Sequence, residues 1–588
     1  MAKKMMEDLV FNQMICSEGY KVDYAVGTTY SLDLNSFMSL PFSLGFIEDP
    51  DEAMKSSIAY LFTALRLCTG KLALFCNFSN IKAPEGQKNT FLGLIEKSIF
   101  PVNPVNKMKK NPELVNFHPK VWIIQETGMN GEGSRIKVIV MSRNITMDNS
   151  LDVVCELTGT IGEKDAPQTS QTKHKPLWDF LNYLKRYADQ QKAKMIERLI
   201  VSLKKVREFD LDDSPFDDYS FHPMGIKDHM SDGQELLTHL QRSKEVMVIS
   251  PFIDASTLQG FSDADKKTLI TREMSLTSGI VDCFGQDNIY ITNQQMLDNE
   301  ESNPVDLHAK IYYTRDKEYR QHMHLGSANA TWNGFNRNVE FLLGLRFALH
   351  QSSYDKFREN FINDDKDCKF EPMIALPEYK GDKVLEINET LVLRRTISSI
   401  LKAQVHPQED SRYTVYLITE EEISSEAYLY PLMCPNMKTQ LTSGIRFCDL
   451  ELEQLSEFFV IEHGYAKQLI KIATEGIPEN RDEAICRRIL NRDHFMDCIS
   501  FLLADSKKAY VAEKVVNDAL MGGGSRNEES HNIDFPSLYE NLLKTAYERP
   551  DVYEDMDIFI RSLPQDIIPE EFYSLYKDIQ KAIKNYTR

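Results

Sequence analysis

The feature that most constrains this chain is a pattern of polar residues that occurs twice, 190 residues apart. Each copy starts with a His-x-Lys triplet and a β-branched or aromatic run, crosses a polar turn, and returns as a strand-like run into Ser-x-Asn-x-Thr. A carboxylate follows in a further strand-like run. The first copy holds His118, Lys120, Ser142, Asn144 and Asp152, and the second holds His308, Lys310, Ser327, Asn329 and Glu340. A repeat of this length predicts two related lobes, because solenoid repeats have periods of about 20–50 residues.

A short apolar run precedes each copy. Residues 71–80 and 245–256 are both apolar and end in polar turn residues, which predicts buried strands that end at a polar edge. Between the copies, residues 176–206 have apolar residues at three- and four-residue spacing, which predicts helix. His322 and His324 flank a strand-like run, and we expect them to face solvent.

The spacing inside each triplet places two functional side chains together. In a strand, residues i and i+2 face the same side. His118 and Lys120 would therefore share one face, as would His308 and Lys310, while the spacer residues between them point away.

Two such half-sites can cleave a phosphodiester without a metal or another cofactor. One neutral imidazole attacks phosphorus and becomes a phosphohistidine, and the other, protonated, donates to the leaving oxygen. Lys120 and Lys310 would hold the phosphoryl oxygens, and Asn144 and Asn329 would add N–H donors. Preorganised donors of this kind contribute roughly 3–4 kcal/mol each to catalysis. We expect no metal ligand and no cofactor-binding residue.

Four further residues are candidates for supporting this chemistry. A carboxylate bonded to the distal imidazole nitrogen fixes the tautomer and raises the basicity of the ring. Asp152 and Glu340 are candidates for this role, each for one of the two histidines, with the edge of a strand as the alternative. Ser142 and Ser327 lie two residues before the asparagines, where a hydroxyl could hold the asparagine or a phosphate oxygen.

Composition limits the class of protein and its location. The formal net charge of −20 argues against indiscriminate coating of anionic polymers, but it allows a locally positive cleft. The ten cysteines are scattered without a C-x-x-C pair, which is typical of reduced thiols in the cytosol. The N-terminus lacks a long apolar segment, and no apolar run reaches the roughly 18 residues of a membrane span. We therefore expect a cytoplasmic protein that does not use a membrane.

The organisation predicted along the chain has three parts. Lobe 1 would cover residues 1–215 and lobe 2 residues 216–375, each with one half-site. Residues 376–588 would form an acidic accessory or interaction region that becomes helical toward its end. This region holds 37 acidic and 25 basic residues, which suits a protein partner or a contact with a basic cleft. Self-association is compatible with the sequence but is not required for a complete site.

The duplicated motif resembles the phospholipase D superfamily, whose signature is H-x-K with a later G-S-x-N, present twice. The match is specific in residues 116–157 and 306–345. The second block keeps Gly326, whereas the first has Met141 at the glycine position. The common family form also has Asp five residues after the Lys, where this chain has Gln125 and Arg315. This departure resembles the His-Lys-Asn branch, which includes tyrosyl-DNA phosphodiesterases and nuclease-like proteins.

The resemblance implies a fold, a mechanism and a substrate. The fold would be α/β, with two phospholipase D-like α/β/α lobes forming a pseudo-two-fold cleft, plus a mixed-to-helical C-terminal region. A phosphohistidine on His118 would form, with His308 as acid and base, although the reverse assignment stays open. The branch favours a nucleic acid substrate, DNA more than RNA. The second block is also similar to bacterial proteins of phage defence, which suggests an antiviral nuclease effector.

Two other functions remain open from the sequence. One is a phospholipase or phosphatidyl transferase, and the absence of a signal peptide and of a strongly amphipathic membrane stretch argues against it. The other is a catalytically silent scaffold of this fold that binds a protein partner through its acidic region. Trp332, just after the second Ser-x-Asn-x-Thr, could stack a base, with a core or lid role as the alternative.

Overall fold

The computed structural model places the chain in two compact units. The first unit contains residues 1–32, 73–80 and 100–385, and the second contains residues 33–72, 81–99 and 386–588. The predicted boundaries at residues 215 and 375 stay a prediction. The residues that the structure describes are 19–44, 58–82, 92–104, 115–129, 132–146, 150–293, 306–362, 368–376, 392–419, 424–489, 495, 499, 542–545, 552–561 and 563–586.

The first half of the first unit is built on a six-stranded sheet. Its strand order is β5-β3-β1-β6-β7-β9, and β1, β6, β7 and β9 pair in antiparallel fashion. All six residues of β3 are buried, as expected for a central apolar strand. The strands are β1 (Tyr20–Thr29), β3 (Leu72–Asn77), β5 (Ile99–Val102), β6 (Val121–Gly128), β7 (Arg135–Met141) and β9 (Val154–Thr160).

The second half of the first unit is built on an eight-stranded mixed sheet of order β10-β17-β16-β15-β11-β12-β13-β18. The central strands β11, β12 and β13 are parallel, and β15 pairs with β11 in antiparallel fashion. The strands are β10 (Phe216–Met224), β11 (Glu245–Ile249), β12 (Lys266–Thr271), β13 (Ile289–Thr292), β15 (Ile311–Arg315), β16 (Gln321–Gly326), β17 (Glu340–Phe347) and β18 (Phe370–Pro372).

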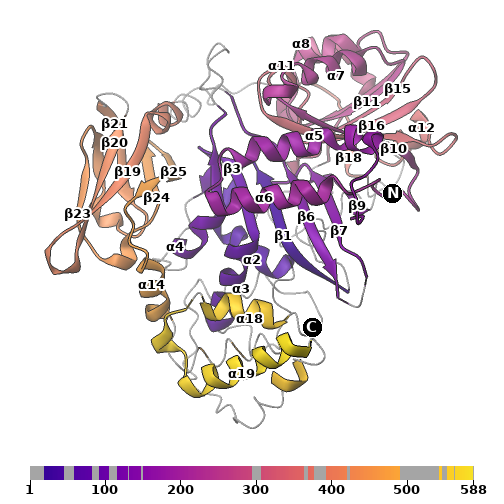
Figure 1. The fold of residues 1–588 in the computed structure, drawn as a ribbon. Coiled ribbons are helices and arrows are strands. Elements are labelled where there is room, and N and C mark those ends of the chain that lie inside the picture. Colours follow the sequence, from indigo (N-terminus) through magenta and orange to yellow (C-terminus); the bar gives the residue numbers. More distant parts are fainter. Residues whose placement is uncertain are drawn as a thin grey trace. The chain divides into compact units, whose positions relative to one another are not determined.

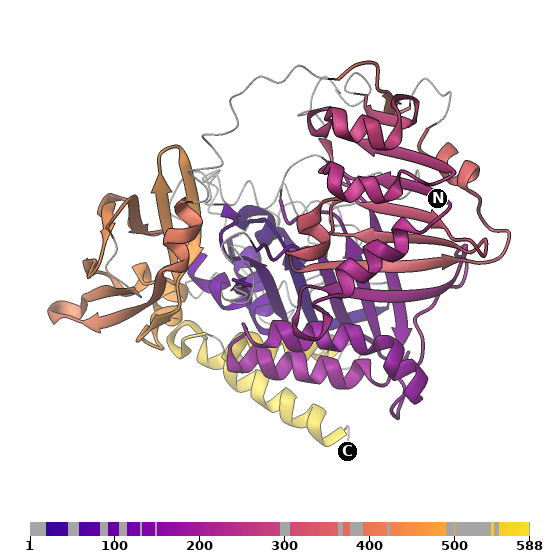
Figure 2. The same cartoon turned by 90° about the horizontal axis from the view of Figure 1, so that it is seen from above.

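Helices cover these sheets, and a small ladder joins the two halves. The helices α5 and α6 lie side by side (Figures 1 and 2). The ladder is parallel and pairs β14 (Asp306–Leu307) with β8 (Ser150–Leu151). The helices are α5 (Gln168–Lys185), α6 (Gln190–Leu203), α7 (Asp232–Gln241), α8 (Ala255–Leu258), α9 (Ser278–Phe284), α11 (Trp332–Asn336) and α12 (Tyr354–Glu359).

The helical pattern predicted over 176–206 forms two helices. The chain breaks between Lys185 and Gln190, and the Asp189 carboxylate accepts a hydrogen bond from the Lys192 N–H at 2.8 Å. This is an N-cap, which satisfies one of the free N–H groups at the start of α6. The apolar spacing continues across the break, so it predicts helix without predicting the interruption.

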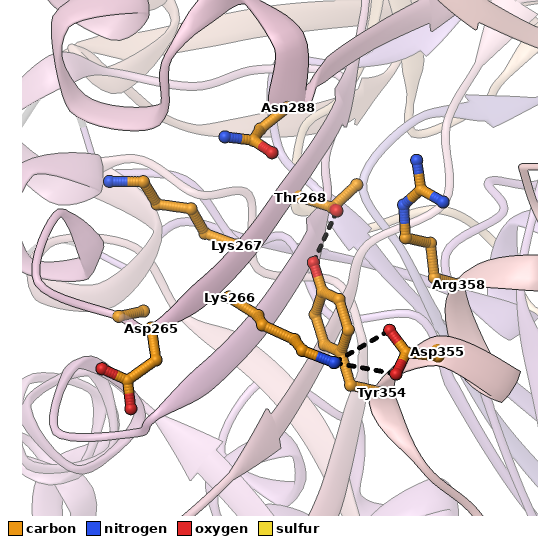
Figure 3. A pocket seen from close by; sticks show the side chains of 9 residues that line it. Asp265, Lys266, Lys267, Thr268, Asn288, Tyr354, Asp355 and Arg358 are labelled. Carbon is orange, nitrogen blue, oxygen red and sulfur yellow. Dashed lines mark hydrogen bonds and ion pairs between the residues drawn. The ribbon is translucent and has the colours of Figure 1, made fainter.

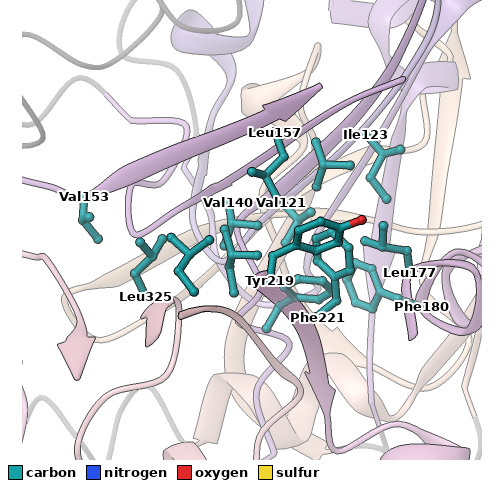
Figure 4. Close-up of a cluster of buried hydrophobic side chains, with 14 of the residues drawn as sticks. Val121, Ile123, Val140, Val153, Leu157, Leu177, Phe180, Tyr219, Phe221 and Leu325 are labelled. Carbon is teal, nitrogen blue, oxygen red and sulfur yellow. The ribbon is translucent and has the colours of Figure 1, made fainter. Parts of the chain in front are cut away.

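One apolar core serves both sheets of the first unit. Val121 and Val140 of the six-stranded sheet belong to the same buried cluster as Phe221 and Leu325 of the eight-stranded sheet, and Phe180 of α5 packs among them (Figure 4). Interiors packed in this way transmit strain and hold their elements rigidly. The shared core therefore fixes the two halves of the first unit against each other.

The second unit combines sheets with helices from distant parts of the chain. A four-stranded sheet has the order β23-β20-β19-β26, and a six-stranded sheet has the order β2-β4-β25-β24-β21-β22. The strands are β2 (Leu32–Asp33), β4 (Ile81–Lys82), β19 (Ile400–Pro407), β20 (Tyr413–Thr419), β21 (Ser424–Pro431), β22 (Thr439–Thr442), β23 (Arg446–Leu450), β24 (Phe458–His463), β25 (Ala466–Lys471) and β26 (Thr474–Glu475). The helices are α2 (Leu34–Ser43), α3 (Ile58–Lys71), α4 (Leu92–Ile95), α14 (Arg481–Ile489), α18 (Val552–Arg561) and α19 (Glu570–Tyr586).

These elements confirm the predicted α/β class with a C-terminal region that changes from strands to helices. Strands dominate residues 400–475, and helices follow from Arg481 in the described part of the chain. Among the described residues, no helix is long and apolar enough to cross a membrane.

Candidate active site

Each His-x-Lys triplet lies in the segment that leads into a strand, not inside the strand. The strand β6 begins at Val121, just after Lys120, and β15 begins at Ile311, just after Lys310. The predicted strand geometry of the triplets is therefore wrong. The lysine still turns toward its histidine, because the Lys120 Nζ donates to the His118 carbonyl at 2.8 Å and the Lys310 Nζ to the His308 carbonyl at 2.5 Å.

His118 is bonded to a carboxylate from the other copy of the motif. Its Nδ1 lies 2.9 Å from the Glu340 Oε2, and Glu340 is the first residue of β17. The Ser327 hydroxyl donates to the same oxygen at 2.5 Å. Because a carboxylate can only accept, the Nδ1 of His118 carries the hydrogen.

His308 has the matching arrangement. Its Nδ1 lies 2.9 Å from the Asp152 Oδ1, and the Ser142 hydroxyl donates to that oxygen at 2.5 Å. Asp152 lies between β8 and β9, so this carboxylate comes from the first copy. Each serine thus holds the carboxylate of its own copy, and each carboxylate holds the histidine of the other copy.

Backbone pairing explains why the carboxylates cross over. Phe117 forms a parallel bridge with Val339, and the His118 N–H donates to the Val339 carbonyl at 2.9 Å. The ladder of β14 with β8 does the same for the other half-site, where the His308 N–H donates to the Leu151 carbonyl at 2.9 Å. Each triplet is therefore aligned with the segment that carries the opposite carboxylate.

Burial sets the charge state of the two histidines. Burial lowers the pKa of His118 to about 4, against the opposing effect of Glu340. Burial and then the charge of Lys310 lower the pKa of His308 to about 4, although Asp152 opposes this. Both rings are therefore neutral near pH 7 in the unliganded protein, with Nδ1–H bonded to a carboxylate. This leaves each Nε2 as the lone-pair nitrogen.

The two lysines and Asp152 also have shifted pKa values. Burial and then the charge of Lys310 lower the pKa of Lys120 well below that of an ordinary lysine. Burial lowers the pKa of Lys310 to about 7, against the charges of Asp152 and Glu340. For Asp152, burial alone would raise the pKa, but His308 and the hydrogen bonds from His308, Ser142 and Ser150 lower it overall. The charges of each half-site therefore change pKa values in the other half-site.

The two asparagines differ in their partners. The Asn144 Oδ1 accepts from the Ser31 N–H at 3.3 Å, with the Thr29 hydroxyl 3.5 Å away, so its amide nitrogen is the end that remains for a ligand. The Asn329 Oδ1 is buried and has no hydrogen-bond partner among the described residues. A polar atom left in this way is costly unless a ligand or water reaches it.

Three residues near the site were not predicted from the sequence. The Tyr30 ring lies against the His118 ring, with centroids 4.8 Å apart, and the Lys120 Nζ is 5.5 Å from the Tyr30 centroid. The Asn338 Nδ2 donates to the Glu340 Oε1 at 3.1 Å. The Arg143 Nη1 is 3.4 Å from the Asp152 Oδ2. Asn338 is two positions from Glu340 and Arg143 is nine positions from Asp152, so their closeness in sequence to the candidate carboxylates is a signal that could have found them. Tyr30 belongs to no motif and carries no such signal.

A recess elsewhere in the second half of the first unit is not part of this site. It is lined by Lys266, Thr268, Tyr354 and Asp355 among others (Figure 3). Lys266 starts β12, so the recess lies at the amino end of that strand, whereas the His308 triplet lies at the opposite edge. The Lys266 Nζ is paired with the Asp355 carboxylate at 2.8 Å, and the Tyr354 and Thr268 hydroxyls are bonded to each other.

Known proteins provide only distant matches. No family model and no curated protein matches the chain. A crystal structure of yeast tyrosyl-DNA phosphodiesterase is similar to this chain, with 13% identity and a TM-score of 0.34, covering 59% of this chain and 87% of that one. A mutant of the yeast enzyme has 12% sequence identity and a TM-score of 0.35, with the same shares of both chains covered. Polyphosphate kinase from Porphyromonas gingivalis has 11% identity and a TM-score of 0.30, covering 58% of this chain and 42% of that one.

Proposed function

We propose that this protein is a metal-independent phosphodiesterase that cleaves nucleic acid, DNA in preference to RNA, through a phosphohistidine. The observation that carries the proposal is the pair of crossed hydrogen bonds from His118 to Glu340 and from His308 to Asp152. They leave two neutral Nε2 atoms, one from each copy of the motif, beside two buried lysines. A nucleophile and a proton carrier of this kind are what a two-step displacement at phosphorus needs.

The first step transfers the phosphoryl group to the protein. The Nε2 lone pair of His118 attacks phosphorus, and a P–N bond forms while the P–O bond to the leaving strand breaks. The leaving oxygen takes the proton from the Nε2 of protonated His308. Lys120, Lys310 and the amide of Asn144 hold the non-bridging oxygens, where negative charge concentrates.

The second step releases the product. Neutral His308 accepts a proton from water, the water oxygen attacks phosphorus, and the P–N bond breaks to regenerate His118. The resting protein must gain one proton for the first step, because both histidines have a pKa of about 4. The negative charge of the bound phosphodiester supplies the driving force, since an opposite charge within about 4–6 Å favours the protonated imidazole.

The test is cleavage of end-labelled single-stranded and duplex oligonucleotides, DNA and RNA, in EDTA. We expect strand cleavage by the wild type and a loss on the order of 10²–10⁴-fold for His118→Ala and for His308→Ala. His406→Ala is the matched control, because this exposed histidine lies on β19 in the second unit. His308→Ala should accumulate an acid-labile covalent adduct at His118, because the general base for hydrolysis is missing.

Two other outcomes would overturn the proposal, and a third would correct the roles of the two histidines. Hydrolysis of phosphatidylcholine vesicles without strand cleavage would assign a phospholipase. Full activity of both histidine variants in bacteria that express the chain, scored as resistance to plated phage, would leave a silent scaffold. An adduct that accumulates in His118→Ala instead would reverse the two histidine roles while keeping the reaction.

A further inference from the structure

Three large exposed apolar side chains lie near the His308 half-site. Phe252 is 49% exposed, Met274 59% and Trp332 49%. They lie in the segments that follow β11, β12 and β16, where Met274 belongs to a short 3-10 helix and Trp332 is the first residue of α11. Because β11 and β12 are parallel and β15 is antiparallel to β11, the carboxyl ends of β11 and β12 share an edge of the sheet with the start of β15. That edge is the one that carries His308 and Lys310.

Backbone contacts hold the segments of Phe252 and Trp332 together. Ile253 and Ala330 form a parallel bridge, and the Asp254 N–H donates to the Ala330 carbonyl at 3.1 Å. The Trp332 N–H donates to the Asp254 carboxylate at 2.5 Å. The backbones that carry the two exposed rings are therefore held against each other. Such preorganisation lowers the entropic cost of binding a ligand.

An arginine lies over each of these two rings. The Arg272 guanidinium is 4.7 Å from the Phe252 centroid, and the Arg337 guanidinium is 5.1 Å from the Trp332 centroid. These distances are within the range of cation–π contacts, about 6 Å. Arginine and aromatic faces together suit a ligand that has both flat rings and negative charge.

Arg272 connects one ring to the candidate active site. Its Nε donates to the Leu307 carbonyl at 3.0 Å, and Leu307 precedes His308. It also pairs with Asp306 at 2.8 Å, which precedes Leu307. The charge of Arg272 lowers the pKa of Lys310. Arg272 therefore lies over the Phe252 ring and is bonded to the two residues that precede His308.

We propose that Phe252 and Trp332, each with its arginine, form a stacking subsite for the nucleobases of a single-stranded nucleic acid. The subsite rests on the proposed function, because it binds the bases next to the phosphate held at His308 and Lys310. Bases in a duplex are already stacked on each other, whereas unpaired bases can stack on protein rings. A sequence-independent preference for single strands follows, since every base has a flat face.

The experiment measures binding of the whole chain to two fluorescent 12-mers. Every protein compared carries His118→Ala, because cleavage would otherwise destroy the strands, and the chain with this change alone stands as the wild type for binding. One is oligothymidylate, and the other has the same phosphates with abasic tetrahydrofuran residues. We expect the wild type to bind oligothymidylate at least about tenfold more tightly, and we expect this preference to disappear in Trp332→Ala. Phe252→Ala should reduce it, and Trp332→Tyr should retain most of it, because tyrosine also stacks.

Tyr319→Ala is the matched control. Tyr319 is 72% exposed with the Arg315 guanidinium 4.9 Å from its centroid, but it follows β15 and so lies at the other edge of the same sheet. This variant should keep the wild-type preference. An equal loss in Tyr319→Ala, or equal binding of both strands by the wild type, would overturn the subsite.

Hydrolysis of bis(4-nitrophenyl) phosphate by the wild type separates this proposal from the proposed function. Turnover of this small diester together with a base preference that survives in Trp332→Ala would overturn the subsite and support the phosphodiesterase. A Trp332-dependent base preference without turnover of the small diester or of any oligonucleotide would support the subsite and overturn the phosphodiesterase.

Discussion

At the scale of single residues, the bonded nitrogen of each histidine decides what its other nitrogen can do. Glu340 and Asp152 fix Nδ1–H in His118 and His308, and each carboxylate is itself held by a serine. A carboxylate that accepts both bonds keeps the ring in one tautomer and one orientation. The same burial that protects this arrangement also lowers the pKa of the neighbouring lysines.

In the proposed reaction, the charge of Lys310 sets a limit on the alkaline side of the pH profile. Its pKa of about 7 means that it loses its charge as the pH rises above 7. A neutral amine attracts the phosphodiester less. Because His308 must also gain a proton and has a pKa of about 4, kcat/KM for a small diester already falls roughly tenfold per pH unit at neutral pH, and the loss of the Lys310 charge should steepen this fall to roughly a hundredfold per unit above about pH 7. Lys310→Arg keeps its charge and should lack this steepening, although its maximum will be lower because guanidinium geometry differs. A wild-type slope that does not steepen above about pH 7 would contradict this.

The sequence points to the residues of the candidate site and to one carboxylate for each histidine, but not to which carboxylate bonds which histidine. The repeated spacing identifies both histidines and both carboxylates, because each copy carries the same residue types in the same order. It does not distinguish a carboxylate that serves its own copy from one that crosses over. The observed bonds join residues 222 and 156 positions apart, and only the pairing of the two halves determines them. Tyr30 belongs to no motif and enters the site through the end of β1.

At the scale of elements, the strands β10 and β16 and the helix α7 gather four histidines on one side of the second sheet. His222 and His324 have ring centroids 5.5 Å apart, and His239 of α7 lies 6.4 Å from His322. Gly344 of β17 lies between the first two, since a Cβ there would be 3.0 Å from the Nε2 of each. The expectation that His324 faces solvent is wrong, because it is 5% exposed. The alternation of side chains along β16 does not show which of its two faces is buried. His239 of helix α7 lies beside the face that carries His322 and His324.

This cluster should make the first unit less stable in acid. Burial lowers the pKa of His222 to about 4, with His229 and His239 lowering it further and Asp232 opposing them. An unfolded histidine titrates near 6.5, so the unfolded chain gains protons first and stability is lost as the pH falls from 6.5 toward 4. For His222 the loss at pH 5 is about 2 kcal/mol.

The measurement is urea unfolding at pH 7.5 and pH 5, followed by tryptophan fluorescence. The three tryptophans, Trp122, Trp178 and Trp332, all belong to the first unit. His222→Gln can still bond the Ser220 hydroxyl, which lies 2.7 Å from the His222 Nε2, but it cannot titrate. It should show a smaller loss of stability between the two pH values than the wild type, while His406→Gln should not. Equal losses in wild type and His222→Gln would remove this histidine as the cause.

At the scale of the whole molecule, the second unit is assembled from segments that the sequence does not connect. Residues 33–72 and 81–99 belong with residues 386–588, although they lie next to the strands of the first sheet in the chain. The Phe62 ring of α3 lies 6.3 Å from the Phe559 ring of α18. Contacts over such separations carry no local spacing signal. The sequence therefore predicts that residues 376–588 become helical toward their end, but not which earlier segments pack against them. The excess of acidic residues in this region does not predict these packing partners either.

A buried ion pair holds one of these segments in place. The Arg481 Nη1 lies 2.6 Å from the Glu96 Oε1, and the two residues are 1% and 2% exposed. The other carboxylate oxygen of Glu96 accepts from the Ser456 hydroxyl at 2.7 Å. The segment that includes Glu96 is thus bonded both to the start of α14 and to the chain before β24. Removing one partner of such a pair leaves a buried charge uncompensated.

Arg481→Met should therefore destabilise the second unit by about 3–5 kcal/mol, because Glu96 loses its cation. The double variant Arg481→Met with Glu96→Leu should recover most of this loss, since it removes both charges of the pair, while Asp482, which Arg481 also contacts, keeps Lys97 as its cation. Far-UV circular dichroism during urea unfolding reports both units, whereas tryptophan fluorescence reports only the first. The dichroism transition of Arg481→Met should move to lower urea and return in the double variant. If the single variant stays within about 0.5 kcal/mol of the wild type, or if the double variant is the less stable of the two, this pair is not what holds residues 81–99 to the C-terminal region.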